Sequence, residues 1–315
     1  MRYSNISGFN ISKFTLGTVQ MGMNYGIANS TGKPGREKSM EILRAAVAGG
    51  INSFDTAMQY GDSEEVLGEF FASDLCKLSS PIITTKFKLS GDGPASAPEI
   101  ERQIYGYVEK SLERLNISCV PIYMIHNAHD IIRHGASVSN AFKRLLDEGM
   151  IKKAAVSVYT CEEAAEMLKY DVYEAIQIPI NIFDRSLMDS GVVAELHKRG
   201  KIIFARSIFL QGLFLIKPDM LKGNLKDAAE PLQRLSALAD SEGMSIAQLA
   251  LSYVRDIDEI TSLVIGVDTA AQLSENMSMM EGSAISEKAR SEVQKAFCGI
   301  PRHVCNPSMW SKQEA

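Results

Sequence analysis

The chain has 315 residues, 45% of them hydrophobic and 23% charged, and a formal net charge of -5 at pH 7. These proportions are typical of a soluble globular enzyme, and the acidic balance disfavours nucleic acid or an anionic membrane as a partner. No apolar run approaches the length of a membrane-spanning helix, and the first residues have no signal-peptide core. The five cysteines are widely spread, which indicates reduced thiols. We therefore expect a cytoplasmic protein, either a monomer or a small homo-oligomer.

Eight short apolar runs alternate with helix-period segments such as 139–149, a pattern typical of parallel α/β proteins. The runs span residues 14–18, 51–55, 81–86, 120–126, 151–158, 174–180, 201–207 and 260–266. Glycines that can end a helix precede three of them, at Gly50, Gly149 and Gly200. Eight strands fit a closed (β/α)8 TIM barrel, and the alternative is an open doubly wound sheet. No G-x-G-x-x-G motif follows the first run, which favours the barrel.

Three further segments complete this organisation. Residues 2–14 resemble a β-hairpin with a tight Ser7-Gly8 turn, which would cap the floor of the barrel. Residues 211–240 are longer than a simple crossover and are expected to hold an inserted loop and a helix. A last helix is expected over 286–297, followed by an irregular tail. We expect a single domain over residues 1–315.

Polar residues follow three of the apolar runs, where the active sites of barrel enzymes lie. Asp55, Lys86 and His126 each end a run, and Tyr60 stands in the loop after Asp55. An ammonium beside a tyrosine lowers the pKa of the phenol, and a carboxylate keeps that ammonium charged and in place. The tyrosine can then donate a proton to a carbonyl oxygen while a hydride reaches the carbon, and a histidine can orient the carbonyl.

Each of these residues also has a purely structural interpretation. Asp55 could cap a helix, and Tyr60 could shield the core at the rim. Lys86 could extend along the surface with its ammonium in water, and His126 could be a hydrogen-bonded residue of the core. Four such residues at consecutive strand ends are much harder to explain by chance. The pattern therefore indicates a proton-transfer site.

Around these residues the sequence resembles the aldo-keto reductase superfamily. The matching segments are GINSFDTAMQYGDSEEVLG (50–68), ITTKF and YMIHNAHD, and the resemblance runs nearly end to end. It implies a (β/α)8 barrel and an NAD(P)H-dependent oxidoreductase that reduces an aldehyde or ketone to an alcohol, with NADP(H) or NAD(H) lying extended over the rim. The implied catalytic residues are Asp55, Tyr60, Lys86 and His126, with Tyr60 as the general acid. Segments such as ARSIFLQGL resemble a bacterial subgroup linked to sugar and polysaccharide metabolism.

The resemblance also implies the residues that bind the cofactor. They are Gly17, Thr18, Ser157, Gln177, Arg206, Ser207, Gln211, Gly266, Gln272, Glu275 and Asn276. Ser157 and Gln177 would hold the nicotinamide amide, although Val158 replaces the usual asparagine. Arg206 takes a place often held by a tyrosine that stacks on the nicotinamide, and an anion of the substrate or the pyrophosphate would explain an arginine better.

The segment 266–283 has no basic residue to pair with the 2′-phosphate of NADPH. We therefore expect NAD(H) and NADP(H) about equally. Polar residues at the rim predict a polar, sugar-like carbonyl substrate. The candidates are Gln20, Asn24 and Tyr25 on the first rim loop, Asn127 beside the histidine, and Trp310 if the tail folds over the rim.

Other functions stay open. A barrel aldolase would use Lys86 as a Schiff base, and a cofactor-sensing subunit would bind the cofactor without turnover. The groupings of His126, His129 and His134, and of Cys298, His303 and Cys305, lack the paired spacing of a structural zinc site. We expect no metal.

Overall fold

The computed structural model describes residues 1–29, 31–73, 78, 80–91 and 93–311. Eight parallel strands form a closed barrel in the order β10-β3-β4-β5-β6-β7-β8-β9. They are β3 (Phe14–Gly17), β4 (Ser53–Asp55), β5 (Ile82–Phe87), β6 (Val120–Ile125), β7 (Ile151–Ser157), β8 (Tyr173–Pro179), β9 (Ile202–Arg206) and β10 (Ser262–Gly266). All eight expected runs form strands, and the closed barrel is confirmed over the open sheet.

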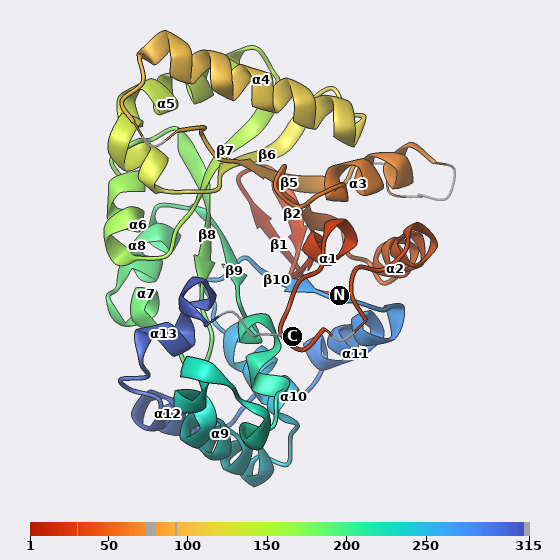
Figure 1. Ribbon diagram of the computed structural model, residues 1–315, viewed down its shortest axis with the longest axis vertical. Coiled ribbons are helices and arrows are strands. Elements are labelled where there is room, and N and C mark those ends of the chain that lie inside the picture. The colour runs from red at the N-terminus through yellow and green to blue at the C-terminus, as the bar shows by residue number, and fades with distance from the viewer. Residues whose placement is uncertain (30, 74–77, 79, 92, 312–315) are drawn as a thin grey trace.

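Helices surround the strands on every side in Figure 1. They are α1 (Val19–Gly22), α2 (Arg36–Ala48), α3 (Ser63–Ala72), α4 (Ala97–Leu115), α5 (His129–Asp147), α6 (Cys161–Met167), α7 (Ser186–Asp189), α8 (Val192–Lys198), α9 (Ala229–Ser241), α10 (Ile246–Arg255), α11 (Ala270–Met280), α12 (Glu287–Ala296) and α13 (Arg302–Cys305). Short 3-10 turns are η1 (Leu210–Leu215), η2 (Pro218–Met220), η3 (Gly223–Ala228) and η4 (Pro307–Met309). Within the described ranges, no helix is both long enough and apolar enough to cross a membrane.

Helix α4 illustrates why these segments form helices. Its buried residues recur every three or four positions, so that one face packs against the barrel; they are Ile100, Ile104, Val108, Ser111 and Leu115. A proline stands in the first helical turn, where no backbone N–H needs a partner. The helix ends at Asn116, whose left-handed backbone (φ 53°) satisfies the last carbonyls.

The expected hairpin covers the floor of the barrel. Strands β1 (Tyr3–Ile6) and β2 (Phe9–Ser12) pair antiparallel, and the Ser7-Gly8 turn has positive φ at both residues, as a tight hairpin turn requires. Ile11 is fully buried in a cluster with residues of the barrel interior, and Ile6 and Phe9 pack against that cluster. The hairpin therefore closes the end of the barrel opposite the strand C-termini.

The expected insertion and tail are also present. The segment after β9 holds η1, η2 and η3 and then α9, and α12 forms within the expected range 286–297. Helix α13 packs against η3, and Figure 1 shows it just beyond the end of β8. The tail thus lies beside the rim where the candidate site is expected.

Candidate active site

The register of the barrel gathers the candidate residues at one rim. At the ends of β10, β3 and β4, Gly17 pairs with both Gly266 and Asp55. At the ends of β7 and β8, Ser157 pairs with Gln177. Because parallel strands end at the same edge, residues far apart in the sequence become neighbours here.

Asp55 and Lys86 form a buried ion pair at the centre of this rim. The side chain of Lys86 is fully buried, and its Nζ donates to Asp55 Oδ2 at 2.7 Å and to the Thr56 carbonyl at 2.9 Å. Burial lowers the pKa of Lys86, and the Asp55 carboxylate opposes that change. The Lys86 ammonium is thus held in a fixed position by two acceptors.

Tyr60 lies over this pair. The Lys86 ammonium is 5.0 Å from the centre of the Tyr60 ring. We expected the ammonium to lower the pKa of Tyr60, but other effects are larger: burial, and then the Asp55 carboxylate, raise that pKa above its usual value. The phenol therefore keeps its proton throughout the neutral range. Among the described residues its hydroxyl makes no hydrogen bond to Lys86 or His126, and both groups contact the ring instead.

His126 packs edge-on against Tyr60, with ring centres 5.7 Å apart. Burial lowers the pKa of His126 to about 3, and the charges of Lys86 and Arg206 act in the same direction. The imidazole is therefore neutral at physiological pH, with one N–H donor and one acceptor nitrogen. Its Nδ1 lies 3.3 Å from Gln59 Oε1, and this contact determines which nitrogen faces the site.

Glycines fix the backbone that carries Tyr60. A Cβ on Gly22 would lie 1.6 Å from the Tyr60 carbonyl oxygen, and one on Gly61 would lie 2.1 Å from the Gly22 carbonyl oxygen. No side chain fits at such distances. Helix α1 and the Tyr60 loop therefore touch backbone to backbone.

Hydroxyl groups tie the same loop to the barrel. Ser63 Oγ donates to the Thr18 carbonyl at 3.0 Å and accepts from Thr56 Oγ1 at 2.8 Å. Thr18 Oγ1 donates to the Asp55 carbonyl at 3.0 Å. The hydroxyl of Thr18, a candidate cofactor residue, is thus bonded within the protein and joins β3 to β4.

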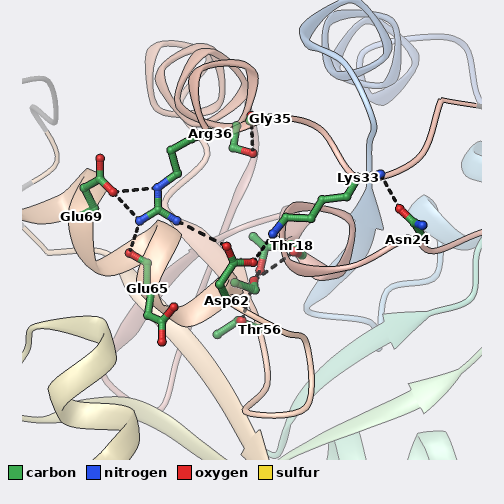
Figure 2. Close-up of polar contacts among 11 residues, drawn as sticks. Thr18, Asn24, Lys33, Gly35, Arg36, Thr56, Asp62, Glu65 and Glu69 are labelled. Atoms are coloured by element: carbon green, nitrogen blue, oxygen red, sulfur yellow. Dashed lines mark hydrogen bonds and ion pairs between the residues drawn. The ribbon is translucent and has the colours of Figure 1, made fainter.

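Figure 2 shows the charged contacts outside these hydroxyls, between the first rim loop and α3. Asp62 accepts from Lys33, and Arg36 Nε donates to Glu69 at 2.7 Å. Asn24 Oδ1 accepts from the Lys33 backbone N–H at 2.7 Å. The Lys33–Asp62 contact joins the first rim loop to the start of α3, Arg36–Glu69 joins α2 to α3, and Asn24–Lys33 closes the loop on itself.

The two candidates for the nicotinamide amide, Ser157 and Gln177, are both 2% exposed. Gln177 Nε2 donates to Asp55 Oδ1 at 2.7 Å, so both oxygens of this carboxylate have partners. Gln177 therefore connects the amide candidates to the Asp55–Lys86 pair.

Gly266, a candidate cofactor residue at the end of β10, also lies very close to a neighbouring side chain. A Cβ on Gly266 would lie 2.4 Å from the amide oxygen of Gln20, which is buried and has no hydrogen-bond partner among the described residues. We assigned Gln20 to the substrate, but its amide lies against Gly266. In α11, Gln272 Oε1 accepts from the Asp268 backbone N–H at 2.7 Å. Asn276 is buried there and Glu275 is exposed.

Arg206 takes an orientation that the sequence did not predict. Its guanidinium lies 4.1 Å from the centre of the Tyr159 ring, and Nη2 donates to the Val158 carbonyl at 3.1 Å. Ser207 and Gln211 follow with positive φ values of 65° and 53°, a conformation that costs energy in residues other than glycine.

A model of the aldo/keto reductase family matches residues 13–296 of this chain. The chain belongs to the aldo/keto reductase family. Membership supports an oxidoreductase that acts on carbonyl compounds, as the resemblance implied.

Relatives and solved structures agree with this assignment. The chain is 26% identical over 330 residues to L-glyceraldehyde 3-phosphate reductase of Escherichia coli (strain K12), covering 93% of this chain and 91% of that protein. It is 25% identical over 316 residues to aldo-keto reductase YhdN of Bacillus subtilis (strain 168), covering 93% and 92%. The fold matches the aldo-keto reductase AKR11C1 from Bacillus halodurans in its holo form, with TM-score 0.75, 20% identity and coverage of 94% and 96%. It also matches the glycerol dehydrogenase AKR11B4 from Gluconobacter oxydans, with TM-score 0.75, 21% identity and 97% coverage of both chains.

In this aldo/keto reductase, the candidate substrate residues lie in different places. Tyr25 and Asn24 line a cavity of about 390 Å³ together with Gln211, which we had assigned to the cofactor. Asn127 Oδ1 accepts from the His129 backbone N–H at 3.2 Å, at the start of α5. Trp310 donates from its ring nitrogen to the Val304 carbonyl at 3.2 Å and does not line this cavity.

Sequence reasoning missed several residues of the site. Tyr159 stacks with Arg206, Gln59 contacts His126, and the Thr56 carbonyl accepts from Lys86. All three stand within four residues of a strand end, which was the available signal. Their roles depend on contacts across the barrel, and no local pattern reports such contacts.

Proposed function

We propose that this aldo/keto reductase uses NAD(P)H to reduce a polar, sugar-like aldehyde or ketone to an alcohol. One observation carries the proposal: a buried Lys86–Asp55 ion pair lies under the ring of Tyr60, which packs against a neutral His126. This is the set of groups that proton donation to a carbonyl oxygen requires.

Each group has a distinct part in this chemistry. The cofactor supplies the hydride when it is bound. Tyr60 donates its proton to the carbonyl oxygen, and the nearby Lys86 ammonium stabilises the phenolate that forms. Asp55 keeps Lys86 charged despite its burial. His126 is neutral and orients the carbonyl by a hydrogen bond.

The chain's own residues fit a nicotinamide cofactor. Ser157 and Gln177 are adjacent in register and buried, which suits recognition of the amide. The Gln20 amide oxygen, buried without a partner beside Gly266, is an orphaned acceptor on the adenosine side of the rim. The segment 266–283 has no basic residue, and the half-buried Asp268 accepts from Asn29 Nδ2 at 2.9 Å.

These features support use of NADH at least as well as NADPH. A titration of protein fluorescence with each cofactor separates the two. We expect dissociation constants within about a hundredfold of each other, which corresponds to about 2.7 kcal/mol. A stronger preference for NADPH would show that a cation outside 266–283 pairs with the 2′-phosphate.

The polarity of the rim supports a hydroxylated substrate. Asn24, Tyr25 and Gln211 line one cavity at this rim, and the relatives include an L-glyceraldehyde 3-phosphate reductase and a glycerol dehydrogenase. Glyceraldehyde and short aldoses are therefore the first substrates to test, in both reaction directions.

The proposed acid is tested by Tyr60→Phe. We expect kcat to fall by several orders of magnitude while cofactor affinity stays near wild type, because only the proton donor is lost. Tyr105→Phe is the matched control: it removes a hydroxyl that contacts Glu148 on the outer helices. An unchanged rate in Tyr60→Phe would remove Tyr60 from the mechanism. Cofactor binding without turnover in the wild type would instead indicate a sensing subunit.

The aldolase alternative has one observation in its favour, because burial lowers the pKa of Lys86 and thus favours an amine. Two hydrogen bonds to acceptors oppose it, since they stabilise the ammonium. Borohydride trapping of a carbonyl compound on Lys86 would distinguish an aldolase from a reductase. We expect no adduct.

A further inference from the structure

Arg206 is a half-buried cation whose direct partners carry no negative charge. Its guanidinium stacks on Tyr159 at 4.1 Å, donates to the Val158 carbonyl at 3.1 Å and lies 3.4 Å from the Ser207 hydroxyl. Across the described ranges, no carboxylate lies within ion-pair distance of it. A guanidinium has five N–H donors, so donors remain for another acceptor.

Two other cations near this position have negative partners. Lys86 is paired with Asp55 at 2.7 Å, and Arg185 lies 3.6 Å from Asp189. Arg206, like Arg302, which lines the same cavity at this rim, has no ion pair among the described residues, and of these two it is Arg206 that acts on the Tyr60 site. Its charge acts to lower the pKa of Tyr60, Lys86 and His126, which places it close to the reacting groups. A partly buried charge without a counter-ion is costly unless a ligand supplies one.

Arg206 also lines a second cavity, of about 460 Å³, at the same rim. The walls come from the ends of β7, β8 and β9, from the start of α6 and from the segments 183–189 and 297–307. They carry three carboxylates, Glu162, Asp184 and Asp189, and three guanidinium groups, Arg185, Arg206 and Arg302. A volume of this size is ordinary for a small polar ligand. The Arg206 guanidinium thus stands between this cavity and the Tyr60 site.

The direction of the side chain favours a substrate over the cofactor's pyrophosphate. Arg206 belongs to β9, which lies between β8 and β10 in the barrel. Its guanidinium turns to Val158 and Tyr159, just beyond β7, and thus away from β10 and α11. The residues expected to hold the adenosine lie on that opposite side.

We propose that Arg206 binds an acidic group, a phosphate or a carboxylate, carried by the carbonyl substrate. The inference rests on the proposed function and defines its substrate class: an anionic, hydroxylated aldehyde or ketone. The acidic group occupies the cavity beside Tyr159, and the carbonyl reaches Tyr60. A planar guanidinium suits both groups, since each presents two oxygens in the geometry of its N–H donors.

The kinetic test compares substrates that differ only in the acidic group. Glyceraldehyde is measured against glyceraldehyde 3-phosphate, and glycolaldehyde against glyoxylate, with wild type, Arg206→Gln and Arg206→Lys. Arg44→Gln is the control, because it removes one positive charge from the exposed face of α2. We expect Arg206→Gln to lower kcat/KM tenfold to a hundredfold for the acidic member of one pair and less than threefold for its neutral partner. Arg206→Lys should recover part of the loss, and Arg44→Gln should match wild type.

A binding measurement separates this proposal from the proposed function. Thermal shift and calorimetry with inorganic phosphate and with malonate are run on the cofactor-bound protein, where no turnover is needed. We expect wild type to bind at least one anion and Arg206→Gln to lose that binding, with unchanged dissociation constants for NADH and NADPH. The anion that binds, and the substrate pair that responds, identify phosphate or carboxylate.

Three results would overturn the assignment of Arg206. They are equal losses of kcat/KM on acidic and neutral substrates, a tenfold weaker binding of NADH or NADPH by Arg206→Gln, and anion binding that survives in that variant. The second would assign the guanidinium to the pyrophosphate. A wild type that binds the anion through Arg206 but reduces no carbonyl compound would contradict the proposed function while supporting the anion site.

Discussion

At the level of single residues, burial pushes Lys86, Tyr60 and His126 toward their neutral forms. The Asp55 carboxylate, 2.7 Å from Lys86, opposes this effect at the ammonium, and the Arg206 charge opposes it at Tyr60. The site therefore contains the Lys86–Asp55 ion pair, a phenol that keeps its proton and an imidazole that is uncharged. Such a distribution suits proton donation at neutral pH.

The state of His126 predicts how stability depends on pH. Its pKa is lowered to about 3 from 6.5, so the unfolded chain binds a proton more readily between these values. Stability from this group is present above about pH 6.5 and is lost as the pH falls toward 3. Each pKa unit corresponds to about 1.4 kcal/mol. Between pH 7 and pH 4 the wild type should lose unfolding free energy in part because His126 resists protonation. We expect His126→Gln to lose less than wild type over this range, by on the order of 1–3 kcal/mol.

Urea unfolding at the two pH values measures this difference. His197→Gln, on the exposed face of α8, is the control and should keep the wild-type pH dependence. If His126→Gln loses as much stability on acidification as wild type, the imidazole is not held neutral by its surroundings.

The sequence predicted the catalytic candidates better than their electrostatics. Asp55, Lys86 and His126 follow apolar runs, and strand ends meet at one rim, so their proximity could be inferred. The direction of the pKa change at Tyr60 could not be inferred from the sequence, because the burial of its hydroxyl depends on side chains that pack against it from other strands. The stacking of Arg206 on Tyr159 was equally hidden, since it joins two strands that are not neighbours.

At the level of elements, the close approach of α1 to the Tyr60 loop sets the position of the proposed acid. We expect Gly22→Ala to lower kcat about a hundredfold, because its Cβ would lie 1.6 Å from the Tyr60 carbonyl oxygen. Cofactor affinity should change little, since the contact lies on the Tyr60 side of the rim. Steady-state kinetics and fluorescence titration measure the two effects.

A matched control is Gly106→Ala in α4. A Cβ there meets no atom within 4 Å, and alanine favours a helix more than glycine by up to about 1 kcal/mol. This variant should keep full activity and gain stability. Wild-type kcat in Gly22→Ala would show that the Tyr60 loop can move without cost.

Element boundaries show where local pattern fails. The helix expected over 139–149 begins ten residues earlier, at His129, and contains a kink at His134. Its first part is rich in histidine and includes Gly135, so its helix propensity is weak. Tertiary packing stabilises this part of the helix instead. A Cβ on Gly135 would lie 2.0 Å from the Tyr170 hydroxyl, so the helix backbone approaches that ring closely.

At the level of the whole molecule, the barrel separates the end that stabilises the fold from the end that carries chemistry. Two observations predicted a closed barrel. The sequence has eight apolar runs, and it lacks the G-x-G-x-x-G motif that an open, dinucleotide-binding sheet would carry after its first strand. The floor hairpin was also predictable from its Ser7-Gly8 turn. The arrangement of α13 and η3 at the rim was not, because irregular segments are placed by tertiary contacts alone.

This separation predicts that a large loss of stability at the floor leaves activity intact. Ile11 is fully buried under the barrel, in a cluster with Met124 and Phe204. We expect Ile11→Ala to lower the free energy of unfolding by about 2–5 kcal/mol, the usual cost of such a cavity. Well below the melting temperature, kcat/KM for carbonyl reduction should stay within about twofold of wild type, because the rim geometry does not depend on the hairpin. Ile132→Ala, at a position 47% exposed, is the matched control and should change neither quantity. A drop in kcat/KM in Ile11→Ala, measured on protein shown by circular dichroism to be folded, would mean that the floor and the rim are mechanically coupled.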